Sequence, residues 1–288
     1  MAQADDLPDN WGQWGEDDES GTLNLITDAV RERAAAEVRT GRTVSLAMPV
    51  TPAPIVMGPF APDTIEASPV QQMMTLTPRA AQATADVMLV TNHAFWTHLD
   101  ALSHQAMDGL VYPGRPLDDS VTPAGVVHGS TTAFASGVVT RGVLLDLAAD
   151  SPLPGGPVTG RDLDAAEERQ GVTLEPGDAL VLRGGRTLKD APPVPGVSVD
   201  AVRWMHRRDV SLYAGDIGDA RPPLNPGTPS PLHKIALVRL GMPLIDAAYV
   251  EDLAATCAQL SRYSFLLAVA PPRILGMTGI PVNPIAIF

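Results

Sequence analysis

At 288 residues, with 45% apolar and 18% charged side chains, the chain is predicted to form one large or two small globular domains with a sizeable core. A formal net charge of −13 argues against nucleic acid or an anionic membrane as a partner. The single cysteine, Cys257, excludes an intramolecular disulfide and a cysteine-rich zinc site. The sequence has neither a secretory signal nor an apolar run of transmembrane length, so we expect a soluble cytoplasmic protein that acts on a small molecule.

Helix and strand patterns are mixed along the chain, which predicts the α/β fold class. In chain order we expect a helix over 22–39, strands over 44–48, 86–91 and 137–147, a helix over 159–170, a strand over 178–183, a helix over 199–208, strands over 210–214 and 233–240, a helix over 250–260 and a strand over 263–270. Thr27 or Asp28 can cap the first helix, and Thr159 and Gly171 fit the start and the stop of the second. The Pro-rich stretch over 50–80 is a long excursion of a kind that often forms a lid or a pocket wall.

Three of the six histidines, His93, His98 and His104, lie close together in the sequence, with Asp100 among them. Imidazole and carboxylate groups are ligands that zinc or manganese takes in proteins. On a strand, His98 and Asp100 point to the same face, and if the chain then turns into a helix, Asp100 and His104 lie one turn apart. One carboxylate can therefore lie between two imidazoles, which predicts a catalytic metal site.

Motifs of several other enzyme classes are missing from the sequence. It has no Gly-x-Ser-x-Gly elbow, no P-loop, no Gly-x-Gly-x-x-Gly after a strand and no His-Glu-x-x-His. Neither a serine hydrolase of the elbow type nor a nucleotide cofactor is therefore expected.

The histidine cluster also resembles the signature of a known family. The run Thr97-His98-Leu99-Asp100-Ala101-Leu102-Ser103-His104 is similar to the His-x-Gly-Thr-His-x-Asp-x-Pro-x-His pattern of the cyclase family that contains bacterial kynurenine formamidase, isatin hydrolase and some polyketide ring cyclases. Further segments resemble the longer members of that family: 10–15, 21–25, 141–146, 204–206 and 279–286. The resemblance thus spans most of the chain.

The resemblance implies a single compact α/β domain over 1–288, with a barrel-like mixed sheet flanked by helices and an N-terminal extension over about 1–40 packed on it. It also implies one or two divalent ions, zinc or manganese. The expected assembly is a homodimer or a higher homo-oligomer.

The family pattern assigns roles to particular residues of this chain. His98 and Asp100 match metal ligands, with Asp100 placed to bridge two ions, and His104 matches the general acid/base. His233 matches a later metal-ligating histidine. The carboxylate that follows it in the family is usually Glu, whereas the nearest candidate here is Asp246, one residue later than the family spacing.

The sequence departs from the pattern at three places. Trp96 stands where the family has Gly, and Leu102 where it has Pro. The first histidine of the pattern falls on Ala94, whereas the chain has His93. On a continuous strand His93 and His98, five apart, face opposite sides, so His93 is a ligand only if a bulge intervenes; otherwise one metal position is degraded.

These observations lead to three functional hypotheses. The first is a metal-dependent hydrolase that uses metal-activated water on a small cyclic or aryl amide or lactone. The second is a polyketide-type cyclase or dehydratase with the same metal site. The third, favoured by the displaced His93 and by Asp in place of Glu at 246, is a metal-free family member without enzymatic activity.

Overall fold

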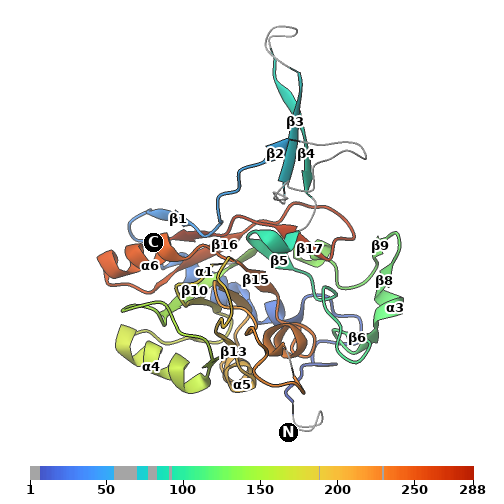
Figure 1. The fold of residues 1–288 in the computed structure, drawn as a ribbon. Coiled ribbons are helices and arrows are strands. Elements are labelled where there is room, and N and C mark those ends of the chain that lie inside the picture. Colours follow the sequence, from blue (N-terminus) through green and yellow to red (C-terminus); the bar gives the residue numbers. More distant parts are fainter. Residues whose placement is uncertain (1–6, 55–69, 77–82, 91–92, 188, 229) are drawn as a thin grey trace.

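A mixed nine-stranded sheet forms the centre of the structure, a computed structural model that describes residues 7–54, 70–76, 83–90, 93–187, 189–228 and 230–288 (Figure 1). Its strands, in spatial order, are β1 (Thr43–Ser45), β18 (Ile285–Ile287), β16 (Ser264–Val269), β10 (Val138–Asp146), β12 (Ala179–Arg183), β14 (Leu212–Gly215), β15 (Leu244–Asp246), β5 (His98–Asp100) and β17 (Gly279–Pro281). The sheet curls into a half-barrel flanked by helices, as the family resemblance implies (Figure 1).

Helices and short turns of helix surround this sheet. They are η2 (Gly21–Leu25), α1 (Asp28–Ala35), η3 (His93–Phe95), α3 (Leu117–Ser120), η4 (Thr131–Phe134), α4 (Gly160–Gln170), α5 (Val199–Arg207), η5 (Leu232–Leu237) and α6 (Glu251–Leu260). Smaller strands pair outside the main sheet: β2 (Ala53–Pro54) with β3 (Val70–Leu76) and β4 (Ala85–Val90), β6 (Leu110–Val111) with β7 (Arg115–Pro116), β8 (Val121–Thr122) with β9 (Gly125–Val126), and β11 (Pro157–Val158) with β13 (Gly196–Val197). Among the residues described, no helix is long and apolar enough to cross a membrane.

The four strands β10, β12, β14 and β15 run parallel to one another. Most of their residues are buried and apolar, as expected for parallel strands that are covered on both faces. Because neighbouring parallel strands end at the same edge of a sheet, the loops that follow them gather there, which is where ligands bind in open α/β sheets. The strand β5 runs antiparallel to β15, so it begins at that same edge.

The helix boundaries follow from capping residues named in the sequence. The predicted helix over 22–39 is divided into η2 and α1, because Thr27 accepts a hydrogen bond from the Val30 amide and restarts the helix. The helix α4 begins at a capping box in which the Thr159 amide donates to Asp162 at 2.8 Å. It ends at Gly171, whose φ of 61° lies in the left-handed region that glycine adopts without strain.

One predicted strand is wrong. The segment over 233–240 forms the short π-helix η5 followed by a turn. Its centre, 235–238, is a short apolar run, and such a run does not distinguish a buried helix from a buried strand. The carboxylate of Asp219 accepts a hydrogen bond from the Leu232 amide at 2.9 Å, which satisfies one donor at the start of this helix.

The sheet of β2, β3 and β4 stands away from the body as an arm (Figure 1). All six residues of β4 are exposed, and Met88 keeps 64% of its surface exposed. Further exposed apolar side chains on the arm are Met73, Met74, Val87, Leu89 and Val90. The predicted excursion over 50–80 contributes β2 and β3 to this arm; its segments 55–69 and 77–80 lie outside the described residues.

Candidate metal centre

Six side chains converge at the edge of the sheet where the parallel strands end. They are supplied by η3, β5, the turn after β5, η5 and the end of β15: His93, His98, Asp100, His104, His233 and Asp246. The strand register explains part of this convergence, because Asp246 pairs with His98 across β15 and β5. The structure therefore brings together every site residue that was predicted from the sequence.

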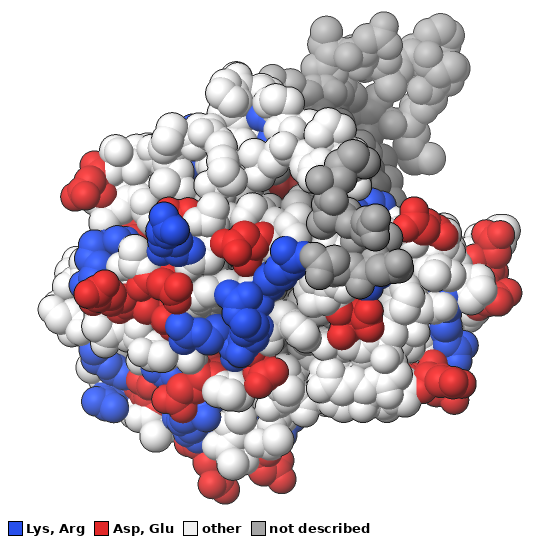
Figure 2. Space-filling model, turned by 90° about the horizontal axis from the view of Figure 1, so that it is seen from below, with Lys and Arg blue, Asp and Glu red and all other residues white. Residues whose placement is uncertain are grey.

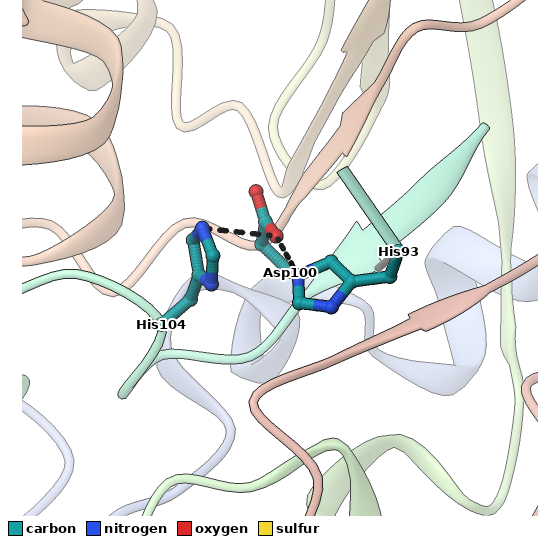
Figure 3. Close-up of side chains that lie close together, drawn as sticks. All are labelled: His93, Asp100 and His104. Carbon is teal, nitrogen blue, oxygen red and sulfur yellow. Dashed lines mark ion pairs between the residues drawn. The ribbon is translucent and has the colours of Figure 1, made fainter. Parts of the chain in front are cut away.

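The carboxylate of Asp100 lies at the centre of the cluster and is completely buried. Its Oδ1 is 3.7 Å from Nε2 of both His93 and His104 (Figure 3). The same oxygen is 3.4 Å from Nε2 of His98. Its Oδ2 is 3.6 Å from Nε2 of His233. Neither carboxylate oxygen has a hydrogen-bond partner among the residues described, and neither does Nε2 of His93.

These unpartnered atoms fit a divalent cation. Burial of polar atoms without partners is costly, and cation binding at the cluster would offset this cost. Two ligand atoms bound to one tetrahedral zinc lie about 3.3–3.4 Å apart, close to the separations of 3.3 Å between His233 and Asp246 and 3.4 Å between His98 and Asp100. The donor set, imidazole and carboxylate, is one that zinc and manganese accept.

The ligand atoms form two overlapping groups that share Asp100. One group contains His93 and His104, and the other contains His98 and Asp246; within each group all ligand atoms lie within 4.8 Å of one another. A carboxylate shared between two groups in this way is placed to bridge two ions. The arrangement thus supports one or two ions, as the resemblance implies.

The position of His93 corrects the strand-based argument. His93 lies in the 3₁₀ turn η3, before β5 begins, so the alternation of side chains along a strand does not apply to it. Its imidazole reaches the cluster beside β17, where Gly279 pairs with Asp100. Any side chain at Gly279 would collide with this imidazole, so the glycine makes room for it. His93 therefore reaches Asp100 without a β-bulge in the strand.

The helix that would place Asp100 and His104 one helical turn apart is not formed, since the segment after β5 forms a turn. The His104 amide donates to the Ala101 carbonyl at 2.9 Å, which brings the His104 side chain back over Asp100. The remaining two histidines lie outside the cluster. His206 contacts Asn10 at 3.0 Å through Nε2, and His128 is buried elsewhere.

Two histidines of the cluster are oriented by hydrogen bonds from their other ring nitrogen. His98 Nδ1 lies 2.7 Å from the Trp96 carbonyl oxygen, and His233 Nδ1 lies 2.6 Å from Oδ2 of Asp219. Both oxygens only accept hydrogen bonds, so each Nδ1 donates. When the imidazole is deprotonated to bind a metal, its Nε2 therefore presents the lone pair toward the cluster. This is the arrangement by which proteins hold metal-ligating histidines.

A cavity of about 570 Å³ opens onto the cluster. His98, His104, His233 and Asp246 all line it, together with residues of the loops that follow β12 and β14. The volume is within the range of small-molecule sites. None of the described residues of the segment 50–80 lines this cavity, so the part of that segment that can be seen does not form its wall.

Comparisons with known proteins identify the family. The family model described as "Putative cyclase" matches residues 44–220. The chain belongs to this cyclase family. The resemblance read from residues 97–104 is therefore confirmed.

Solved structures agree with the cyclase-family fold. A structure described as a novel cyclase is 29% identical over 97% of this chain and 99% of that chain, with a TM-score of 0.82. An isatin hydrolase bound to thioisatinate is 19% identical over 88% of this chain and 93% of that one, with a TM-score of 0.62. Isatin hydrolase A from Labrenzia aggregata, bound to benzyl benzoate, is 21% identical over 92% and 98%, with a TM-score of 0.60. A search of curated proteins finds no match.

Electrostatics divides the histidines of this cyclase-family site into two pairs. Burial, together with the neighbouring His98, lowers the pKa of His93 to about 4, and burial also lowers the pKa of His104. Both imidazoles are therefore neutral at pH 7. Burial alone would lower the pKa values of His98 and His233, but the surrounding carboxylates outweigh it and raise both. Because metal ligands must be deprotonated, binding of a divalent ion releases protons from this second pair.

Asp219, which lies beside His233 in this cyclase-family site, was not predicted from the sequence. It lies four residues after the end of strand β14. Its carboxylate contacts Nδ1 of His233, the ring nitrogen that faces away from the cluster. The signal that could have found it is weak: a carboxylate in the loop after a predicted strand. Its place becomes evident only when the strand order brings that loop beside η5.

An Asp219→Asn variant is expected to bind zinc about 10- to 100-fold more weakly than the wild type, because His233 loses the charged acceptor that orients it. Competition with a chromophoric chelator measures this affinity. The exposed Asp150→Asn change removes the same charge outside the cavity and serves as the control. Equal zinc affinity in all three proteins would show that Asp219 does not support the site.

Proposed function

We propose that this protein is a metal-dependent hydrolase of a small cyclic or aryl amide or lactone. The observation that carries the proposal is the buried Asp100 carboxylate, whose two oxygens face four imidazoles and have no hydrogen-bond partner among the described residues. The adjoining cavity gives a small substrate access to the cluster. Membership of the cyclase family and the shared fold of the isatin hydrolases support the same class of reaction.

The residues that would hold the ion are His98, Asp100, His233 and Asp246, with His93 as a further ligand. When bound, a divalent ion such as zinc or manganese lowers the pKa of its water to about 7 and polarises a carbonyl group. The hydrogen bonds that His98 and His233 donate through Nδ1 fix the orientation of both rings. The nitrogens that would bind the ion therefore need little reorganisation.

His104 is the proposed general acid/base. It lines the cavity, and its lowered pKa leaves it neutral and able to accept a proton at pH 7. It takes the proton of the attacking water and returns it to the leaving amine or alcohol. Asp100, 3.7 Å from Nε2 of His104, stabilises the imidazolium that forms in between.

A hydrolysis screen tests the proposal. The protein is incubated with zinc or manganese and with formanilide, dihydrocoumarin or isatin, and release of a carboxylic acid is followed with a pH indicator. Acid release from at least one probe is expected. A protein that holds its metal but releases no acid would instead support the cyclase or dehydratase hypothesis, and a protein that holds none would support the metal-free one.

We also propose that the chain assembles as a homodimer through the arm of β2, β3 and β4. Contiguous exposed apolar side chains are typical of protein–protein interfaces, and the arm carries them on both faces of β4. A Met88→Lys, Leu89→Lys double variant is expected to shift the mass in light scattering from twice 30.3 kDa to that of one chain. The exposed Val38→Lys change on the body is the control. A wild-type protein of one chain's mass would refute the proposal.

A further inference from the structure

Two arginines line the cavity that opens onto the cluster of histidines and aspartates. Arg186 lies in the loop after β12, and Arg221 lies in the loop after β14. Among the described residues that line the cavity, these are the only side chains that carry a fixed positive charge. Their placement stands out because the chain has 33 acidic and only 20 basic residues.

Hydrogen bonds to backbone groups tie together the two loops that carry these arginines. The Asp216 carboxylate accepts from the amides of Gly184 at 2.6 Å and Arg186 at 2.8 Å, which ties the loop after β12 to the end of β14. Further along the same two loops, Val194 and Arg221 exchange backbone hydrogen bonds of 2.8 and 3.3 Å. The backbone of each arginine is therefore held in place by hydrogen bonds.

The guanidinium groups keep donors free for a ligand. Arg186 contacts Asp190 through Nη1 at 3.2 Å, while its Nε is buried and has no partner among the described residues. Arg221 is exposed, and no carboxylate of the described residues lies within ion-pair distance of it. Arg183, at the end of β12, differs from both, because Asp146 and Glu251 occupy its guanidinium at 2.9 and 2.8 Å.

We propose that Arg186 and Arg221 bind a carboxylate of the substrate, so that the preferred amide or lactone is a small organic anion. The inference rests on the proposed function for the reaction but on separate residues for the recognition. A guanidinium matches the planar geometry of a carboxylate and donates two parallel hydrogen bonds to it. Such a pair also offsets the acidic groups that line the same cavity, Asp216, Asp219 and Asp246.

The test compares formanilide with its 2-, 3- and 4-carboxylated derivatives in the wild type and in the variants Arg186→Gln and Arg221→Gln. For the best carboxylated probe, each variant is expected to raise KM about 10- to 100-fold, the loss of one charged hydrogen-bonding partner, with kcat little changed. Turnover of formanilide should stay within a factor of about two. Equal losses for charged and uncharged probes would overturn the proposal.

Two further variants separate recognition from structure. Arg161→Gln removes the same charge at an exposed position of α4, outside the cavity, and should leave all probes unaffected. Asp190→Asn removes the carboxylate that Arg186 contacts but leaves the guanidinium in place. If Asp190→Asn reproduced the effect of Arg186→Gln, the arginine would brace its loop rather than bind the substrate, and the proposal would fail.

Binding without turnover makes the result independent of the reaction. Titration calorimetry with 4-aminobenzoate and with aniline is expected to show tighter binding of the carboxylated amine, weakened about 10-fold or more by each arginine variant. This holds even if the protein hydrolyses neither formanilide nor its carboxylated derivatives, in which case only the proposed function fails. Equal affinity for both amines would overturn the carboxylate site while leaving hydrolysis of uncharged substrates intact.

Discussion

An Asp100→Asn variant is expected to lose its bound metal and to hydrolyse its substrate about 1000-fold more slowly, or worse, because it forfeits several kcal/mol of charge stabilisation. The reason is the central position of this carboxylate, which faces four imidazoles within 3.4 to 3.7 Å. A neutral amide cannot bridge two cations, and its NH₂ group would point a donor at the ligand nitrogens. Metal analysis and initial rates on the same preparation measure both effects.

The matched control for this variant is Asp118→Asn, an exposed carboxylate on α3 that should leave metal content and rate unchanged. Circular dichroism and thermal unfolding show whether the Asp100→Asn protein is folded. Retention of full metal content and activity by a folded Asp100→Asn protein would exclude Asp100 from the site.

A His104→Ala variant is expected to keep its metal and to turn over substrate about 10²- to 10⁴-fold more slowly, the usual effect of removing a general acid/base. His93→Ala is expected to behave in the opposite way and to lose metal. The two histidines are equally far from Oδ1 of Asp100, at 3.7 Å, but only His104 lines the cavity and can reach a substrate. Added imidazole should restore part of the activity of His104→Ala.

Metal content decides between the two roles. If His104→Ala loses its metal, and imidazole restores binding rather than rate, His104 is a ligand. The grouping of His104 with His93 and Asp100 around one position makes this a genuine alternative. The proton transfer would then fall to another group that lines the cavity.

The local part of the site could be predicted from the sequence because its residues are close together. His98 and Asp100 share a short strand and His104 follows in the next turn, so spacing alone brings them near one another. The argument about His93 was wrong because it assumed a continuous strand where the chain makes a 3₁₀ turn. Side-chain alternation is informative only when the element itself is correctly assigned.

The distant part of the site depended on the family resemblance. His233 lies in the cluster, as the resemblance implied, although its segment forms a π-helix instead of a strand. Asp246 tolerates its extra residue of spacing because the pairing of β15 with β5 sets it beside His98. Asp219 and the two arginines that line the cavity were missed, since they belong to loops that only the order of β12, β14 and β15 brings together. Strand order depends on long-range pairing that no local pattern encodes.

The most direct test of the metal centre is the metal content of the wild-type protein, measured by mass spectrometry after purification without added metal and again after incubation with zinc or manganese and gel filtration. We expect at least one ion per chain after incubation, and none retained when His98, Asp100 and His233 are replaced together. A wild-type protein that retains no ion under either condition would contradict the account.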